Sequence, residues 1–175
     1  KKLYDGIEIE SLAAIGVSAM MHGYMPFNEK EEILVPFRTW RNTNTGRAAA
    51  ELSELFVYNI PLRWSISHLY QAILNNETHV KDIKFLTTLA GYVHWQKQAK
   101  KVLGIGDASG MLPIDPTNQE LPAEMVAKIR SSSLPPKKAI GWKLLDILPK
   151  VLTGGKNAGF LTPEGAKRLE RIKAT

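Results

Sequence analysis

Short apolar segments of strand length open this sequence, and segments with helical spacing follow them. Residues 12–20 form an apolar run that includes small side chains, which is typical of a buried strand. Two further apolar runs, at 24–27 and 33–37, flank the polar residues 28–32, which predict a hairpin turn. We therefore expect the chain to begin with three strands.

Helical spacing dominates the rest of the sequence. Helices are predicted over residues 47–56, 67–74, 80–93, 123–129, 143–152 and 162–172. The first of them places Leu52 and Phe56 on one face, and the third carries apolar residues at every third or fourth position. The last has a clear start, with Thr162 as the N-cap and Pro163 at the first helical position. Strands followed by helices indicate an α/β fold.

The composition indicates one soluble domain. A chain of 175 residues, with 44% hydrophobic and 23% charged residues, fits a single globular unit. No apolar run approaches the ~20 residues that a membrane-spanning helix needs, and no apolar signal region follows the first two lysines. The sequence has no cysteine, which excludes disulfides and thiolate metal sites. We expect a cytoplasmic protein without a membrane partner.

Positive charge is concentrated in the second half of the chain. Residues 1–96 contain 9 Lys and Arg against 10 Asp and Glu, whereas residues 97–175 contain 14 against 7. The resulting net charges of −1 and +7 add to the overall +6. The densest cluster, Lys97, Lys100 and Lys101, has no interleaved aromatic side chain. A solvated surface explains this pattern better than a nucleic-acid site, so nucleic acid is not an expected partner.

Generic phosphate and metal motifs are weak in this sequence. Gly104, Gly106 and Gly110 follow the spacing GxGxxxG, not the GxGxxG of dinucleotide-binding loops, so a glycine-rich turn is the better interpretation. The four histidines are too scattered for a metal motif, and we expect three of them to be surface or partly buried helix residues: His68, His79 and His94.

Two segments are better candidates for a binding site. His22 is followed by Gly23 at the carboxyl end of a predicted strand, where active-site groups of open α/β sheets are found. Residues 40–47 contain two arginines with amide and hydroxyl side chains just before a predicted helix. This second segment suits a polyhydroxylated or anionic ligand, but an elaborate helix-cap loop explains it equally well.

Three stretches of the sequence resemble motifs of the FGGY carbohydrate kinases. Residues 15–23 end in Met-His-Gly and look like the xylulokinase-type segment that meets the sugar. Residues 44–51, Asn-Thr-Gly-Arg-Ala-Ala-Ala-Glu, are similar to the run that opens the next helix of that family. Residues 106–110, Gly-Asp-Ala-Ser-Gly, resemble its Asp-Ala-Ser-Gly loop. The three stretches occur in the family order, and the resemblance as a whole extends over residues 7–166, which is nearly the whole chain.

The resemblance implies a fold, a reaction and a set of site residues. It implies a mixed sheet with packed helices, as part of a ribonuclease H-like domain of the actin-like ATPase class. The full enzyme would transfer the γ-phosphoryl group of ATP, with Mg²⁺, to a hydroxyl of a ketose such as xylulose or ribulose. The substrate-binding residues carried over by position are Met21, His22, Gly23, Asn44 and Arg47. Asp107 would order its loop by bonding backbone amides.

The sequence also departs from the family pattern. Thr45 stands where the family has an aspartate, which leaves the identity of the sugar open. The phosphate motif of the first strand would precede Lys1, and the segment with the catalytic base would follow Thr175. We therefore expect residues 1–175 to be a single partial domain, with no catalytic residue, metal site or bound ATP of its own.

The alternative is a non-catalytic scaffold or interaction domain derived from a sugar kinase. A partial domain would expose apolar surface where its missing strands should pack, so association with another copy of the chain is expected.

Overall fold

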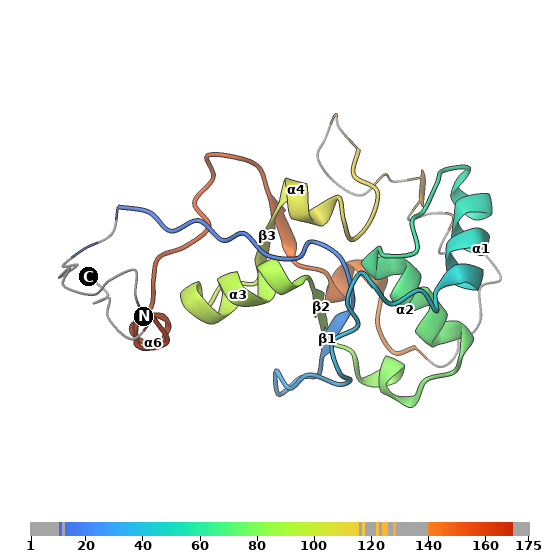
Figure 1. The fold of residues 1–175 in the computed structure, drawn as a ribbon, viewed down its shortest axis with the longest axis horizontal. Helices are drawn as coiled ribbons and strands as arrows, with labels where there is room; N and C mark the ends of the chain where they lie inside the picture. Colours follow the sequence, from blue (N-terminus) through green and yellow to red (C-terminus); the bar gives the residue numbers. More distant parts are fainter. Residues whose placement is uncertain are drawn as a thin grey trace.

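The computed structural model describes residues 11, 13–115, 117, 122, 124, 125, 128 and 140–169. Short strands and helices alternate along this part of the chain (Figure 1). The elements in order are β1 (Met25–Phe27), α1 (Gly46–Phe56), α2 (Ser65–Leu74), the 3-10 helix η2 (Thr78–Asp82), β2 (Phe85–Thr87), α3 (Leu89–Gln98), β3 (Val102–Gly104), α4 (Ile105–Ala108), the 3-10 helix η3 (Leu144–Ile147), β4 (Lys150–Leu152) and α6 (Pro163–Lys167). No helix within the described ranges is both long enough and apolar enough to cross a bilayer.

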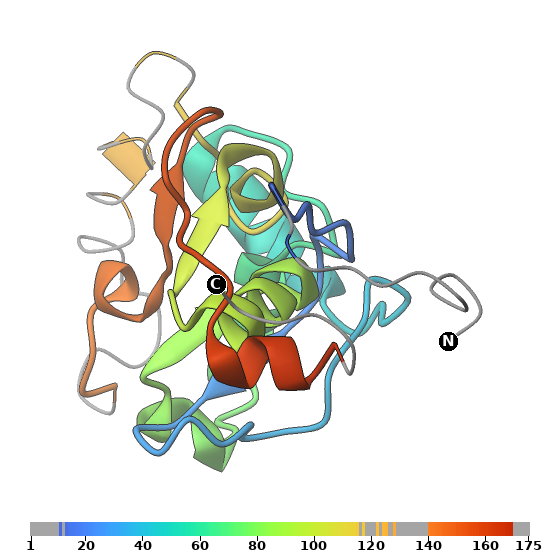
Figure 2. The same cartoon turned by 90° about the vertical axis from the view of Figure 1, so that its left-hand side faces the viewer.

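The strands form two separate two-stranded sheets. β1 pairs with β2 in antiparallel fashion, whereas β3 pairs with β4 in parallel. Figure 2 shows β3 and β4 side by side, with α6 in front of α3. The α/β class predicted from the sequence is therefore confirmed, but the described strands do not join into the one mixed sheet that we expected.

The β1–β2 pair is buried on both faces, and its alternating side chains divide the core in two. Phe27 lies opposite Phe85 and contacts Trp95 edge-on, with ring centroids 5.3 Å apart. On the other face, Tyr24 and Leu86 belong to the larger apolar core beneath α1 and α2. This division follows from the strand period of two, which sends successive side chains to opposite faces.

Helices α1 and α2 pack against each other at one end of the molecule (Figure 1). Their contact is built from Leu52 and Phe56 of α1 and Leu69 of α2, each at most 5% exposed. These side chains recur at helical spacing, so each helix buries one apolar stripe. Both helices, predicted over 47–56 and 67–74, are confirmed. The predicted Thr162 cap of the last helix is also confirmed, because its hydroxyl accepts from the Gly165 amide at 3.0 Å.

The strand predicted over 33–37 is replaced by two isolated bridges, Tyr24 with Arg38 and Phe27 with Ile33, and three further predicted elements differ in the structure. Residues 13–20 are not a strand; most of them are exposed and find no ladder partner. The helix predicted over 80–93 is instead η2, β2 and α3, because Thr88 caps α3 and stops it from extending backwards. The helix predicted over 143–152 is η3 followed by β4, since Pro149 interrupts it and β4 pairs with β3. The helix predicted over 123–129 lies largely outside the described residues.

Candidate functional site

Three chain segments meet beside β1 and the start of α2, and we call this region the junction: residues 21–23, 63–66 and 107–111. Its backbone is tied together by hydrogen bonds between segments. The Gly23 amide donates to the Arg63 carbonyl at 3.1 Å, and the Ser65 hydroxyl donates to the Gly23 carbonyl at 2.6 Å. The Ile66 amide donates to the Met111 carbonyl at 3.1 Å. One amide in the first turn of α2 is thereby bonded inside the protein.

His22 occupies the centre of the junction, with both ring nitrogens engaged. Its Nδ1 lies 3.1 Å from the Gly110 carbonyl oxygen, and the Arg63 Nε lies 3.1 Å from its Nε2. A carbonyl oxygen can only accept and an arginine N–H can only donate, so Nδ1 carries the proton and Nε2 accepts. The imidazole is therefore the neutral Nδ1–H tautomer, oriented from two sides.

Two glycines allow this close approach. A Cβ on Gly110 would lie 2.7 Å from His22 Nδ1 and 2.7 Å from the Met21 carbonyl oxygen. Gly23 has a φ of 107°, and a Cβ there would lie 2.4 Å from the Arg38 carbonyl oxygen. Any other residue at either position would push the segments apart, so the glycines of both motifs are explained by packing.

Asp107 adds a carboxyl group to the junction. Burial raises the pKa of this carboxyl. The expectation that Asp107 orders its loop is wrong for the described residues, because its side chain makes no hydrogen bond to the loop amides. The loop is closed instead by the Gly110 amide on the Asp107 carbonyl at 3.0 Å and by the Ser109 hydroxyl on the Gly106 carbonyl at 2.7 Å.

Residues 40–47, the second segment predicted to bind a ligand, lie next to the junction but are not hydrogen-bonded to it. Arg47 is exposed and donates to Glu51 at 2.7 Å, along α1. Asn44 is exposed, and its amide donates to Asn42 Oδ1 at 3.1 Å. Thr45 is fully buried and donates to the Leu62 carbonyl at 2.7 Å, which ties this loop to the turn that carries Arg63. Across the described ranges, no hydrogen bond joins Asn44 or Arg47 to the junction.

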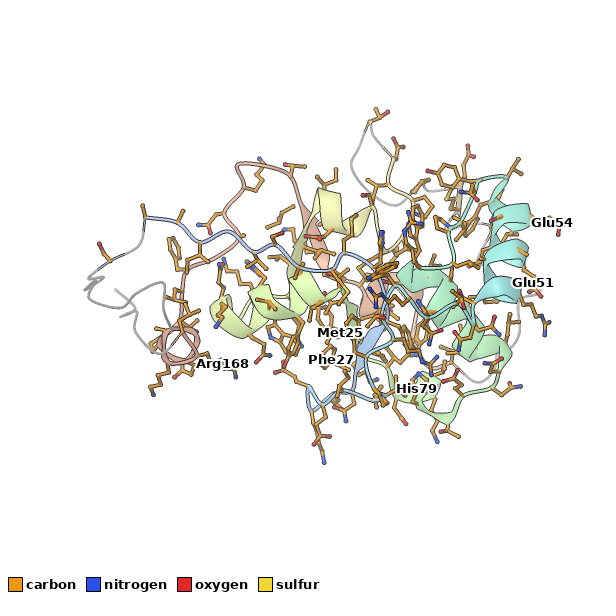
Figure 3. All side chains as sticks on the ribbon, in the orientation of Figure 1. Met25, Phe27, Glu51, Glu54, His79 and Arg168 are labelled. Atoms are coloured by element: carbon orange, nitrogen blue, oxygen red, sulfur yellow. The ribbon has the colours of Figure 1, made fainter. Side chains whose placement is uncertain are left out.

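A second group of polar side chains lies inside the protein, and we call it the interior polar cluster: Tyr24, Arg38, Glu77, His79 and His68. Arg38 forms a two-pronged ion pair with Glu77 and lies 5.4 Å from the centre of the Tyr24 ring. The Tyr24 hydroxyl lies 2.9 Å from His79 Nε2. Figure 3 places His79 below β1, close to Met25 and Phe27.

Burial controls the ionisation of this cluster. It lowers the pKa of His68 to about 4, with the Arg38 charge acting in the same direction. Burial also lowers the pKa of His79, although the Glu77 charge opposes this effect. Burial disfavours the charged form of Glu77, but the hydrogen bond and charge of Arg38 outweigh it, and the pKa of Glu77 is lowered. The expectation of surface or partly buried positions for His68 and His79 is wrong, since they are 0% and 9% exposed.

Sequence reasoning did not find Arg63 or the interior polar cluster. Arg63 lies in the turn before α2, where the Trp64 amide donates to the Pro61 carbonyl at 3.2 Å. Nothing in the local sequence separates this arginine from a solvated one. The neighbouring motif gave the one available signal, because the orientation of a histidine ring in a site is set by the hydrogen bonds of its two nitrogens.

The fold is that of a domain of carbohydrate and polyol kinases. Similar solved structures include a gluconate kinase and a xylulose kinase, both from Lactobacillus acidophilus, and a glycerol kinase from Plasmodium falciparum with ADP. Their TM-scores are 0.77, 0.75 and 0.71, and their sequence identities are 17%, 17% and 13%. Each match covers 99% of this chain but only 34%, 34% and 35% of the other. No protein-family model matches this chain, and no curated protein matches it.

This chain therefore spans about a third of the length of the solved kinases that it matches. The resemblance to the FGGY carbohydrate kinases, drawn from three short motifs, is confirmed at the level of the fold.

Proposed function

We propose that this chain forms the sugar-binding part of an ATP-dependent carbohydrate kinase of the FGGY type, within a ribonuclease H-like domain. One observation carries the proposal. The Met-His-Gly and Asp-Ala-Ser-Gly motifs, whose bonded residues lie 88 positions apart, meet through the 3.1 Å contact between His22 and Gly110. Two short motifs that are remote in sequence come together at one place, as a shared binding site requires.

Met21, His22 and Gly23 would line the sugar pocket in this proposal. His22 is half-buried and rigidly oriented, and Gly23 keeps it in place because the missing Cβ lets the chain pack against the Arg38 carbonyl. Asn44 and Arg47 would border the same pocket, since Thr45 joins their loop to the turn before α2. A site held on three segments by backbone bonds is pre-organised, which lowers the entropy lost when a flexible sugar binds.

ATP with Mg²⁺ would supply the γ-phosphoryl group, which the sugar hydroxyl receives while ADP leaves and the hydroxyl proton passes to a base. We assign that base to a part of the protein outside this chain. In the portion of the chain that the structure describes, no group of three or more His, Asp or Glu side chains is placed to hold a metal ion. Use of ATP is consistent with a cytoplasmic enzyme.

The proposal is tested by replacing His22 in the full-length natural protein. His22→Ala removes the ring that orients the junction. The kcat/KM for the sugar that the parent phosphorylates should therefore fall roughly 5–150-fold, which corresponds to about 1–3 kcal/mol. A coupled assay of ADP release against a panel of ketoses, polyols and sugar acids measures this effect. The matched control is Arg168→Gln, an exposed position at the end of the molecule opposite α1 (Figure 3).

Thermal unfolding of both variants should stay close to that of the parent, because His22 contributes little apolar packing. Unchanged kinetics in His22→Ala would contradict the sugar-site assignment. The absence of any sugar-dependent ADP release by the parent would favour the scaffold alternative.

A further inference from the structure

The guanidinium of Arg63 has an unusual partner. Its Nε donates to His22 Nε2 at 3.1 Å, and the tautomer argument makes that ring neutral. Among the residues that the structure describes, no carboxylate forms an ion pair with Arg63. With Nε engaged, the two terminal nitrogens remain, and their N–H groups form the edge that pairs best with a carboxylate.

Two other arginines show the contrast, whereas Arg41 and Arg168 resemble Arg63 in forming no ion pair with a carboxylate of the described residues. Arg38 gives both terminal nitrogens to Glu77, and Arg47 donates its Nε to Glu51 at 2.7 Å. Each of these side chains has its charge matched by a carboxylate of the protein. Arg63 is exposed and directed to a neutral ring, so its charge is left for a group from outside.

The position of Arg63 is well defined despite its exposure. Its carbonyl oxygen accepts a hydrogen bond from the Gly23 amide at 3.1 Å, which fixes the backbone from which the side chain extends. The Leu62 carbonyl beside it accepts from the Thr45 hydroxyl at 2.7 Å, which holds the turn from the other side. His22, itself oriented by Gly110, then holds the guanidinium. A charged group anchored at both ends loses little entropy on binding an anion.

We infer that Arg63 binds a carboxylate of the substrate and that His22 positions it, so that the acceptor is a sugar acid of the aldonate class. This inference rests on the proposed kinase function and narrows its substrate. His22 has no ring nitrogen left for a ligand while both of its hydrogen bonds are intact. Arg63 then supplies specificity for charge, and hydroxyl groups of the ligand meet the remaining polar surface of the junction.

Asp107 is the acidic group that a bound carboxylate would meet. It forms no ion pair with Arg63, and burial raises the pKa of its carboxyl, which disfavours the charged form. The junction therefore does not neutralise Arg63 internally. The hydroxyl next to the carboxylate of an aldonate would be a suitable donor for the Asp107 oxygens.

A matched pair of ligands tests the inference. D-Gluconate and D-glucitol share six carbons and their internal hydroxyls, and they differ in a carboxylate against a neutral CH₂OH. We would measure the Kd of each by calorimetry on the full-length protein, with D-xylulose as the ketose reference. The parent should bind gluconate at least tenfold more tightly than glucitol, as expected for a charge-assisted, two-pronged contact.

Variants assign this preference to the two side chains. Arg63→Gln should bring the gluconate-to-glucitol ratio to about one, and Arg63→Lys should keep part of it, because lysine retains the charge but not the fork. His22→Gln keeps an acceptor for Arg63 at a similar reach and should preserve much of the ratio, whereas His22→Leu should lose it. Arg168→Gln, an exposed arginine far from the junction, should leave the ratio unchanged.

Each outcome separates the two proposals. The sugar-acid inference would be overturned, and the kinase function left standing, if the parent phosphorylated a ketose or bound glucitol as tightly as gluconate, and if Arg63→Gln did not change the ratio of the two affinities. A parent that binds and phosphorylates none of the three ligands would count against the kinase function itself. Because each ratio is measured within one folded protein, a modest loss of stability in a variant does not alter the result.

Discussion

The junction and the interior polar cluster both place an arginine near a histidine, but they treat the positive charge differently. Inside the protein, Arg38 meets the carboxylate of Glu77, and the two side chains are only 18% and 22% exposed. At the junction, Arg63 meets a neutral imidazole and remains exposed. The first arrangement balances charge where water is scarce, and the second leaves charge unbalanced where water or a ligand can reach it.

This difference separates a structural role from a binding role. A charge withdrawn from water must be paired by the protein, or the folded state loses several kcal/mol. A charge at the surface has no such requirement, so a carefully oriented but unpaired arginine has no evident structural purpose. The interior polar cluster should therefore respond to mutation through stability, and the junction through ligand binding.

Removing the carboxylate of the interior cluster should have the largest effect on stability. Glu77→Gln leaves Arg38 partly buried without its counter-charge and also removes the charge 3.6 Å from His79. We expect the free energy of unfolding to fall by about 3 kcal/mol, at the low end for a broken buried pair because a fifth of each side chain is exposed. Urea denaturation followed by circular dichroism measures this loss.

The control for Glu77→Gln is Arg47→Gln, which breaks an exposed i,i+4 pair on α1. Solvent screens such an exposed pair, which contributes little to stability, so this variant should be nearly as stable as the parent. If the two variants lost equal free energies of unfolding, the Arg38–Glu77 pair would stabilise the protein no more than the exposed pair on α1 does.

A smaller effect should come from the titration of His68. Its pKa is about 4 in the folded protein and about 6.5 in an unfolded chain. The unfolded state therefore binds the proton first, and stability is complete above pH 6.5 and is lost as the pH falls toward 4. The contribution of this one side chain across the window is about 2–3 kcal/mol.

Comparison with His68→Phe isolates that contribution. The phenyl ring keeps the stacking on Tyr24, whose centroid lies 6.3 Å away, but it cannot bind a proton. Unfolding free energies measured from pH 4 to pH 7 should therefore slope less steeply in the variant than in the parent. Parallel pH profiles would mean that His68 gains its proton as readily in the folded state as in the unfolded chain.

Local patterns predicted some elements of the fold and failed for others in a consistent way. Helices α1 and α2 were predictable because each carries its own apolar stripe and because Pro61 breaks the chain between them. The region 80–93 was predicted wrongly because apolar residues at every third or fourth position also suit a buried strand between two helices. Only the pairing of Phe85 with Phe27, which is a long-range contact, decides between them.

The candidate site was predictable only to the extent that its motifs are local. His22 and Gly23 stand out in the sequence, and so does the loop ending at Gly110. Their meeting depends on packing between segments 88 residues apart, which no local pattern encodes. Arg63 could not be found in this way because its role comes entirely from the ring that it meets.

Of the three effects on stability, the one from Gly110→Ala should be the smallest. This variant tests most directly whether the junction differs from the interior polar cluster. The new methyl group would lie 2.7 Å from His22 Nδ1 and 2.8 Å from Met21 Cε, so the ring must move away from the Gly110 carbonyl. The Met21 carbonyl oxygen would also lie 2.7 Å from the new methyl group, so the backbone must shift together with the ring, and we expect a loss of about 1–2 kcal/mol in the free energy of unfolding. The His22 ring signals in ¹⁵N NMR should change with it, since Nδ1 loses its acceptor.

Gly106→Ala is the matched control in the same loop, because a Cβ there meets nothing within 4 Å. It should keep the His22 signals and the stability of the parent. If Gly110→Ala weakens ligand binding at least tenfold while unfolding changes this little, the junction acts through the orientation of His22 and Arg63. Loss of binding in proportion to the loss of stability, or in both glycine variants alike, would instead make the junction a structural contact like the interior polar cluster.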